Sequence, residues 1–165
     1  MNPGSYTVLV RSFDNGDGNL TGIALVELYD LHTTGGRAGN ISTRGPVMTG
    51  EQVLIGGFIV GGSQTKEVVV RAIGPSLAAV GVSGSLSDPT VELRNASGDL
   101  LDSNNNWATH PKAAQIQSEG LAPAQAAESA LQITLSPGSY TAIVRGVNGA
   151  TGIGLVEVYD LSPAP

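Results

Sequence analysis

The side chains best suited to binding chemistry lie between Asp102 and Trp107. Asp102, Asn104 and Asn106 place oxygen ligands at positions i, i+2 and i+4, which is the alternation with which calcium loops begin. An EF-hand is excluded, because Trp107 stands where that loop needs a glycine and no glutamate follows at its twelfth position. Two interpretations remain: a looser Ca²⁺ site in a sandwich loop, or an Asx-rich turn whose side chains bond their own backbone. We expect no other cofactor.

Trp107 is the single tryptophan and the second candidate for ligand contact. An exposed indole could stack on a sugar ring, whereas a buried one would cap one end of a β-sandwich. We favour burial, because one aromatic side chain is a poor sugar platform. The run from Asp14 to Asn19 is also rich in Asp, Asn and Gly, and a hairpin turn is its default interpretation.

No set of residues predicts catalysis. His32 and His110 are far apart in sequence, and the chain contains no cysteine. The serines lie in glycine-rich turns without the G-x-S-x-G nucleophile motif. The acidic residues are scattered singly, so no pair stands out as an acid and base couple. We therefore predict that the protein is not an enzyme.

The strongest signal for organisation is a repeat. Residues 3–11 (PGSYTVLVR) return as residues 137–145 (PGSYTAIVR), and residues 21–31 (TGIALVELYDL) return as residues 151–161 (TGIGLVEVYDL). We predict that each copy is a β-hairpin that closes a module. The expected organisation is a partial repeat at 1–31, a linker at 32–39, a complete module at 40–161 and a tail at 162–165.

Alternation of apolar and polar residues predicts strands throughout the chain. Short strands with turns about every 8 to 12 residues and no βαβ order predict an all-β fold. We expect an antiparallel β-sandwich, jelly-roll or Ig-like, with an additional N-terminal hairpin that duplicates the C-terminal one. The expected strands are 6–13 paired with 23–31, 41–44, 53–60 paired with 67–73, 90–94 paired with 100–103, and 130–135, 140–145 and 152–161. A helical turn is expected at 77–80 and a short helix within 110–130.

Several of these runs resemble a known kind of module. They are 69–77 (VVRAIGPSL), 91–93, 95–99, 102–107, 137–141 and 149–158. Together they resemble a family of β-sandwich modules that recur in tandem in large secreted bacterial surface proteins. They are also distantly similar to pre-peptidase C-terminal domains, which are jelly-roll-like. The resemblance implies export and a non-catalytic role.

Composition limits the partners and the location. A net charge of −6 with only eight Lys and Arg residues gives no basic patch for nucleic acid. No apolar run of about 18 residues is present, so we expect no membrane insertion. Met1 leads directly into a motif of the module, without the pattern of a signal peptide. We expect a section of a longer exported protein, located outside the cell or at its surface.

The surplus N-terminal copy suggests how the protein works. An isolated two-stranded hairpin is marginal in water, and each large apolar side chain left exposed costs about 1.5–3 kcal/mol. This assembly hairpin should therefore pack in one of three ways. It could add to a sheet edge of its own chain's sandwich, complete that sandwich while the C-terminal hairpin reaches a neighbour, or insert into another subunit. The leading hypothesis is a non-catalytic extracellular structural repeat module, joined by hairpin packing or exchange into a stalk or a self-assembling filament. The alternative is an accessory carbohydrate- or Ca-binding module of a secreted enzyme. The hairpin's apolar residues are Tyr6, Val8, Val10, Ile23, Leu25, Val26 and Leu28.

Overall fold

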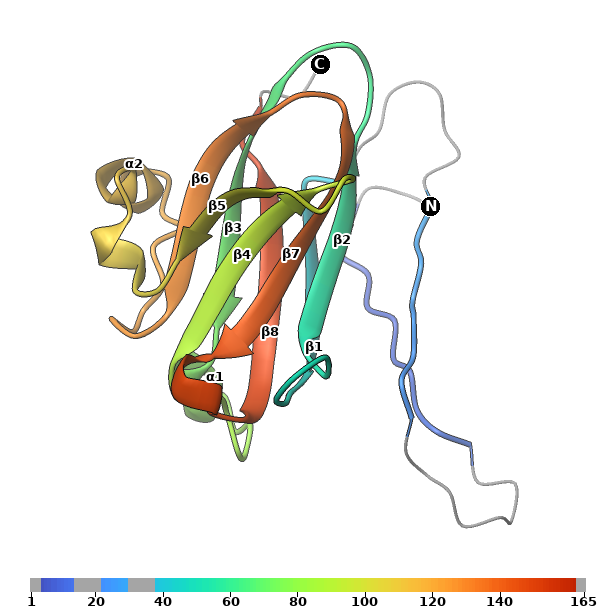
Figure 1. Cartoon of the computed structure of the whole chain (residues 1–165), viewed down its shortest axis with the longest axis vertical. Coiled ribbons are helices and arrows are strands. Elements are labelled where there is room, and N and C mark those ends of the chain that lie inside the picture. The colour runs from blue at the N-terminus through green and yellow to red at the C-terminus, as the bar shows by residue number, and fades with distance from the viewer. Residues whose placement is uncertain (1–3, 14–21, 30–37, 163–165) are drawn as a thin grey trace. The chain divides into compact units, whose positions relative to one another are not determined.

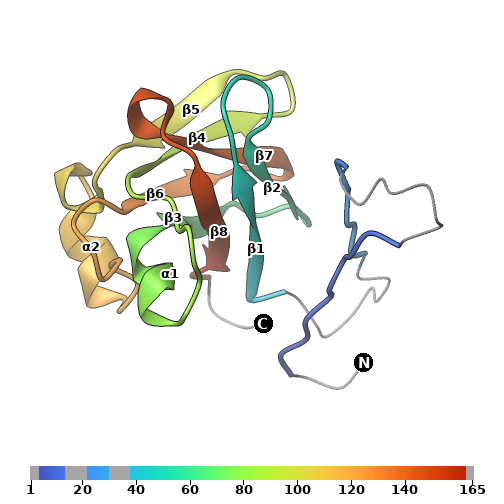
Figure 2. The ribbon, with the colours of Figure 1, turned by 90° about the horizontal axis from the view of Figure 1, so that it is seen from below.

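The computed structural model describes residues 4–13, 22–29 and 38–162. The chain divides into two compact units, residues 1–37 and residues 38–165, and each is treated separately below. The second unit, called the body from here on, contains two four-stranded antiparallel sheets packed face to face (Figures 1 and 2). The predicted all-β sandwich is therefore confirmed. Within the described residues, no helix is long and apolar enough to cross a membrane.

The first sheet has the strand order β1-β8-β3-β6. Its strands are β1 (Asn40–Val47), β8 (Gly152–Asp160), β3 (Lys66–Ile73) and β6 (Ser129–Leu135). The start of β1 lies beside the end of β8, because Asn40 pairs with Tyr159 and Val47 with Gly152. β8 is thus a central strand, held on one side by β1 and on the other by β3.

The second sheet has the order β2-β7-β4-β5. It is formed by β2 (Leu54–Val60), β7 (Gly138–Gly146), β4 (Pro89–Asn95) and β5 (Leu100–Asn104). β7 is the central strand that corresponds to β8, since β2 and β4 pair with its two sides. The two sheets form the two layers visible in Figure 2.

Successive side chains of a strand point to opposite faces of its sheet, so every second one lies between the two sheets, where the main core is. In β3 the inward side chains are Val68, Val70 and Ala72, while Val69 faces outward and is nevertheless fully buried. Strands buried on both faces have continuous apolar sequences, which explains the run VVV at 68–70. The inward residues of the central strands are Ala142, Val144, Val156 and Val158.

Short helices cover the outer face of the first sheet near β3 and β6. Helix α2 (Ala113–Ser118) inserts Ile116 against Val69 and Ala130, and this second cluster also receives Trp107 from the 3₁₀ turn η1 (Trp107–Thr109). Helix α1 (Pro75–Ala79) follows β3 directly, and a second 3₁₀ turn, η2 (Val147–Gly149), follows β7. The short helices predicted near 77–80 and within 110–130 are confirmed.

The strand pairing predicted around residues 61–65 is wrong. Strands β2 and β3 belong to different sheets, so this loop crosses from one layer to the other. The pairing of 90–94 with 100–103 is confirmed as β4 with β5. There the turn is closed locally, because the Asn95 side-chain oxygen accepts hydrogen bonds from the backbone N–H groups of Ser97 and Asp99, both at 2.9 Å.

The predicted C-terminal hairpin is also wrong. Strands β7 and β8 lie in opposite sheets and pair with different neighbours. A tight corner at Gly146–Ala150 sends the chain across the sandwich, with Asn148 at a φ of 53° and the Val147 N–H donating to the carbonyl of Asp88 at 3.0 Å. A Cβ on Gly146 would lie 2.0 Å from the Ala150 carbonyl oxygen, so the corner requires glycine there.

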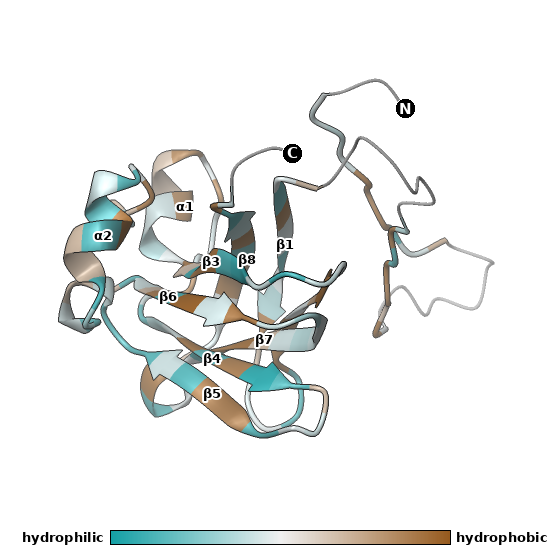
Figure 3. Ribbon diagram, turned by 90° about the horizontal axis from the view of Figure 1, so that it is seen from above, coloured by the Kyte–Doolittle hydropathy of each residue, from teal (hydrophilic) through white to brown (hydrophobic). Residues whose placement is uncertain are grey.

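In the N-terminal unit, the described residues 4–13 and 22–29 carry no assigned strand. The strands expected at 6–13 and 23–31 are therefore not formed in that part of the chain. The C-terminal copy supplies the physical reason: there, the two repeated motifs pair with four other strands and not with each other. Figure 3 shows hydrophobic residues along both described N-terminal segments.

Candidate functional site

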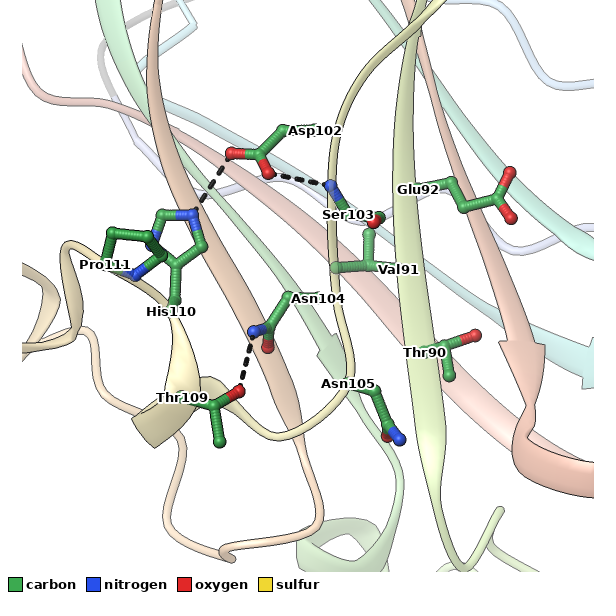
Figure 4. A pocket seen from close by; sticks show the side chains of 10 residues that line it. All are labelled: Thr90, Val91, Glu92, Asp102, Ser103, Asn104, Asn105, Thr109, His110 and Pro111. Atoms are coloured by element: carbon green, nitrogen blue, oxygen red, sulfur yellow. Dashed lines mark hydrogen bonds and ion pairs between the residues drawn. The ribbon is translucent and has the colours of Figure 1, made fainter.

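An open depression of about 510 Å³ lies over β4, β5 and the turn that follows β5 (Figure 4). Its lining is mixed, with polar groups from β4, β5 and the segment Thr109–Pro111. It contains two of the residues predicted to bind calcium, Asp102 and Asn104. The depression is shallow and exposed to solvent, unlike the concave and mostly apolar pockets that bind small molecules.

The buried side chain of His110 joins the loop to β5 through Asp102. His110 Nδ1 accepts the backbone N–H of Lys112 at 3.1 Å, and Nε2 lies 3.1 Å from Asp102 Oδ2. A backbone N–H can only donate, so Nδ1 is unprotonated and Nε2 carries the proton that it donates to the carboxylate. Both ring nitrogens are thus engaged, and His110 has no nitrogen left to activate the neighbouring Ser103. The arrangement anchors the loop and does not form a nucleophilic triad.

The three predicted calcium ligands are only partly brought together. Asp102 and Asn104 lie on one face of β5, but Asp102 accepts bonds from Ser103 N–H and His110, and Asn104 Oδ1 accepts Ala130 N–H at 3.1 Å. Asn106 lies beyond the strand, and its positive φ of 86° turns the chain into η1. Among the described residues, no three His, Asp or Glu side chains gather as metal ligands. Calcium binding here stays a prediction, and the other such run, 14–19, lies outside the described residues.

Trp107 packs into the second apolar cluster with Val69 and Ile116. Its backbone N–H donates to the carbonyl of Glu128 at 2.7 Å, which joins the turn to the start of β6. The indole is partly buried against the protein, and its Nε1 is buried without a hydrogen-bond partner. The burial favoured for this side chain is thus partial, and contact of Trp107 with a sugar stays a prediction.

A fully buried carboxylate, Glu128, is the first residue that sequence reasoning missed. Its two oxygens accept hydrogen bonds from the backbone N–H groups of Gly74, Ser76 and Gln125 at 2.8–3.2 Å and from the Ser76 hydroxyl at 2.7 Å. Two of these groups belong to the start of α1, so Glu128 caps a helix that is 50 residues away in sequence. The motif Gly74-Pro75-Ser76 is thereby explained as the partner of a distant acid.

A second missed cluster joins β3 to β8 on the outer face of the first sheet. The Arg71 guanidinium contacts the Glu157 carboxylate, donates to the Tyr159 hydroxyl at 3.0 Å and lies 5.0 Å from the centre of the Tyr159 ring. The Tyr159 hydroxyl also donates to Glu157 at 3.0 Å. Burial raises the pKa of Tyr159, the nearby charge of Glu157 raises it further, and Arg71 opposes both.

Three charged residues occur in both copies of the repeat, and in the C-terminal copy, as Arg145, Glu157 and Asp160, they have structural roles. Glu157 pairs with Arg71, Asp160 lies 3.7 Å from Lys66, and Arg145 donates to the carbonyl of Gly50 at 2.8 Å in the turn between β1 and β2. These contacts are the cross-strand ion pairs and turn anchors that suffice to explain a recurrence within one chain.

The N-terminal copy exposes the residues that its counterpart buries. Val10 is 55% exposed, whereas its equivalent Val144 is 0% exposed, and Val26 is 52% exposed, whereas its equivalent Val156 is 1% exposed. The remaining residues of the predicted assembly hairpin are exposed as well: Tyr6, Val8, Ile23, Leu25 and Leu28.

The two copies also share one local hydrogen bond. The exposed Tyr29 hydroxyl donates to Glu27 at 2.9 Å, as Tyr159 does to Glu157. In the body this pair is completed by Arg71 from the neighbouring strand. The N-terminal segment therefore carries the core-facing valines and the outward polar pair of two central strands.

The chain is similar to a solved bacterial domain. That domain is the pre-peptidase C-terminal domain of a collagenase from Bacillus anthracis, with 14% sequence identity and a TM-score of 0.45, over 72% of this chain and 88% of that chain. It is of the same kind as the domains that the sequence motifs resemble. No protein-family model and no curated protein matches the chain. A likeness at this level assigns no ligand, partner or activity.

Proposed function

We propose that this protein is a non-catalytic extracellular structural module, linked to neighbouring modules or copies through its N-terminal segment. The links would build a stalk or a self-assembling filament. The partner is a body of this same kind, whether another copy or an adjacent repeat. The extracellular setting is supported by the sequence resemblance to secreted bacterial repeat modules.

One observation carries the proposal. The N-terminal segment repeats the sequences of β7 and β8, yet it exposes Val10 and Val26, whose equivalents lie in the core. Each such apolar side chain gains about 1.5–3 kcal/mol when it is buried. A segment of this composition therefore favours packing against a sandwich, and it supplies a strong reason for modules to join.

The test is the size of the particles across a wide concentration range. Light scattering coupled to size exclusion, with negative-stain microscopy of the same samples, should show linked copies that grow with concentration. Deleting residues 1–31 should abolish this growth. The double substitution Val10→Thr and Val26→Thr should also abolish this growth. It removes apolar surface from the face that corresponds to the buried face of the C-terminal repeat.

The matched control is Leu9→Thr with Leu25→Thr, which changes the opposite face of the same segment. Their equivalents Ile143 and Leu155 are only partly buried in the body. This control should retain most of the assembly. A discrete monomer at every concentration would overturn the proposed linking role.

A further inference from the structure

We propose that the N-terminal segment competes with β7 and β8 for the same two places in the body of its own chain. Its entry would release residues 137–161, which would then be free to enter a neighbouring copy. The inference rests on the proposed function and deepens it: the N-terminal segment would drive the linking by entering its own body, and the released residues 137–161 would make the contact with the neighbouring molecule.

The two places are defined by four neighbouring strands. β7 lies between β2 and β4, and β8 lies between β1 and β3. The segment offers valines or a leucine at four inward positions: Val8 and Val10 for the first place, and Val26 and Leu28 for the second. All four are exposed, and their equivalents are core residues. Both places lie between two strands of the body, so a segment suited to them needs those strands as hydrogen-bond partners. This explains why the segment alone has no assigned strand.

The outward polar groups match the same two places. In the body, Arg71 on β3 holds the Glu157 carboxylate and the Tyr159 hydroxyl. The segment brings Glu27 and Tyr29 with the same internal hydrogen bond. Arg71 would therefore keep a carboxylate partner after the exchange, which avoids leaving a largely buried cation unpaired.

The chain connections allow entry within one chain. Asn40 at the start of β1 pairs with Tyr159, and the Asp160 N–H donates to the Gly39 carbonyl at 3.0 Å. In the place of Tyr159, Tyr29 would lie about 5 Å from Asn40, measured between Cα atoms. The ten residues 30–39 can span about 33 Å. The connection at 12–20 is also four residues longer than its counterpart at 146–150.

A short connection favours the segment's own body over that of a second copy. Because the segment and the body belong to one chain, entry is intramolecular, and its effective concentration is on the order of millimolar, well above that of a dilute sample. The topology produced by entry is that of a circularly permuted module. Its strand order within each sheet is unchanged, and residues 137–161 are left over.

Two sequence differences between the N-terminal repeat and the C-terminal repeat determine which of them normally occupies the two places in the body. The N-terminal repeat has Val8 at the position of the fully buried Ala142. It has Ala24 at the position of Gly154, where an added Cβ would lie 2.9 Å from Val47 Cγ2. Extra atoms in a packed core disfavour entry. The C-terminal copy is therefore the resident one, and the exchanged form is the minor state.

The test uses the full-length chain with Val144→Asp and Val156→Asp, which exclude the resident copy from the core. We expect this variant to fold as a monomer with a cooperative thermal transition at a lower temperature than the wild type. Adding Val10→Asp and Val26→Asp should abolish folding. The control carries Val10→Asp and Val26→Asp in an otherwise unchanged chain, and these substitutions should leave the melting temperature of the body unchanged.

A second variant keeps the proposal testable if the first is unstable. Adding Val8→Ala and Ala24→Gly to the Val144→Asp and Val156→Asp chain restores the residues of the resident copy and should raise its melting temperature. If this chain also fails to fold, the segment does not fit these places and the exchange is disproved. If it folds only as linked copies, its own body is not the acceptor. A monomeric wild type at all concentrations would instead disprove the linking role and leave the folding result unaffected.

Discussion

At the scale of single residues, the buried Glu128 carboxylate is the clearest determinant of stability. Replacing it by alanine removes the acceptor for four hydrogen bonds, and each buried donor left unpaired costs about 1–3 kcal/mol. We expect Glu128→Ala to lower the free energy of unfolding by at least about 3 kcal/mol, measured by urea denaturation followed by circular dichroism. Glu119→Ala is the control, because Glu119 is exposed and directly follows helix α2. Equal effects of the two substitutions would contradict the capping role.

Tyr159 makes stability depend on pH in the alkaline range. Its pKa is raised in the folded state, first by burial and then by the charge of Glu157. Above the ordinary tyrosine pKa of about 10, the unfolded chain loses this proton while the folded chain retains it. The contribution of Tyr159 to stability is therefore complete below about pH 10 and is lost as the pH rises through the folded-state pKa.

Urea denaturation at a series of alkaline pH values tests this dependence. The free energy of unfolding should fall with rising pH, and Tyr159→Phe should make that fall shallower. An unchanged slope in the phenylalanine variant would assign the pH dependence to other groups.

At the scale of elements, the junction between β3 and α1 depends on a close backbone approach. A Cβ on Gly74 would lie 2.2 Å from the Leu86 carbonyl oxygen, and backbone cannot move aside as a flexible side chain does. We expect Gly74→Ala to cost about 3 kcal/mol, at the upper end of overpacking effects, as measured by chemical denaturation. Gly61→Ala is the matched control, because nothing lies within 4 Å of its added Cβ. A stable Gly74→Ala variant would show that the loop at Leu86 can shift.

The sequence predicts the strands of the body better than it predicts their pairing. Period-two alternation located β4 and β5, and the local Asn95 turn fixed their pairing. The same alternation cannot tell a hairpin from a crossing between layers, because both place apolar residues on one face of each strand. That is why β7 and β8 were expected to pair with each other.

The buried and charged groups that the sequence did not reveal depend on long-range contacts. Glu128 meets Ser76 across 52 positions, and Arg71 meets Glu157 across 86. Each looks like an isolated charge in the sequence. The repeat itself was visible from the sequence, but its meaning required the topology. Only the strand order shows that the surplus copy corresponds to two central strands from opposite sheets.

At the scale of the whole molecule, the pairing of β1 with β8 has a mechanical consequence. The start of β1 and the end of β8 lie side by side, with Asn40 opposite Tyr159. A pulling force applied at these two points would act across the ladder and open its hydrogen bonds one pair at a time, starting at the loaded end. Strands loaded from opposite ends would instead have to shear all their bonds together. In a stalk under tension, each such module would open at low force and lengthen. The stalk would therefore extend under load instead of staying rigid.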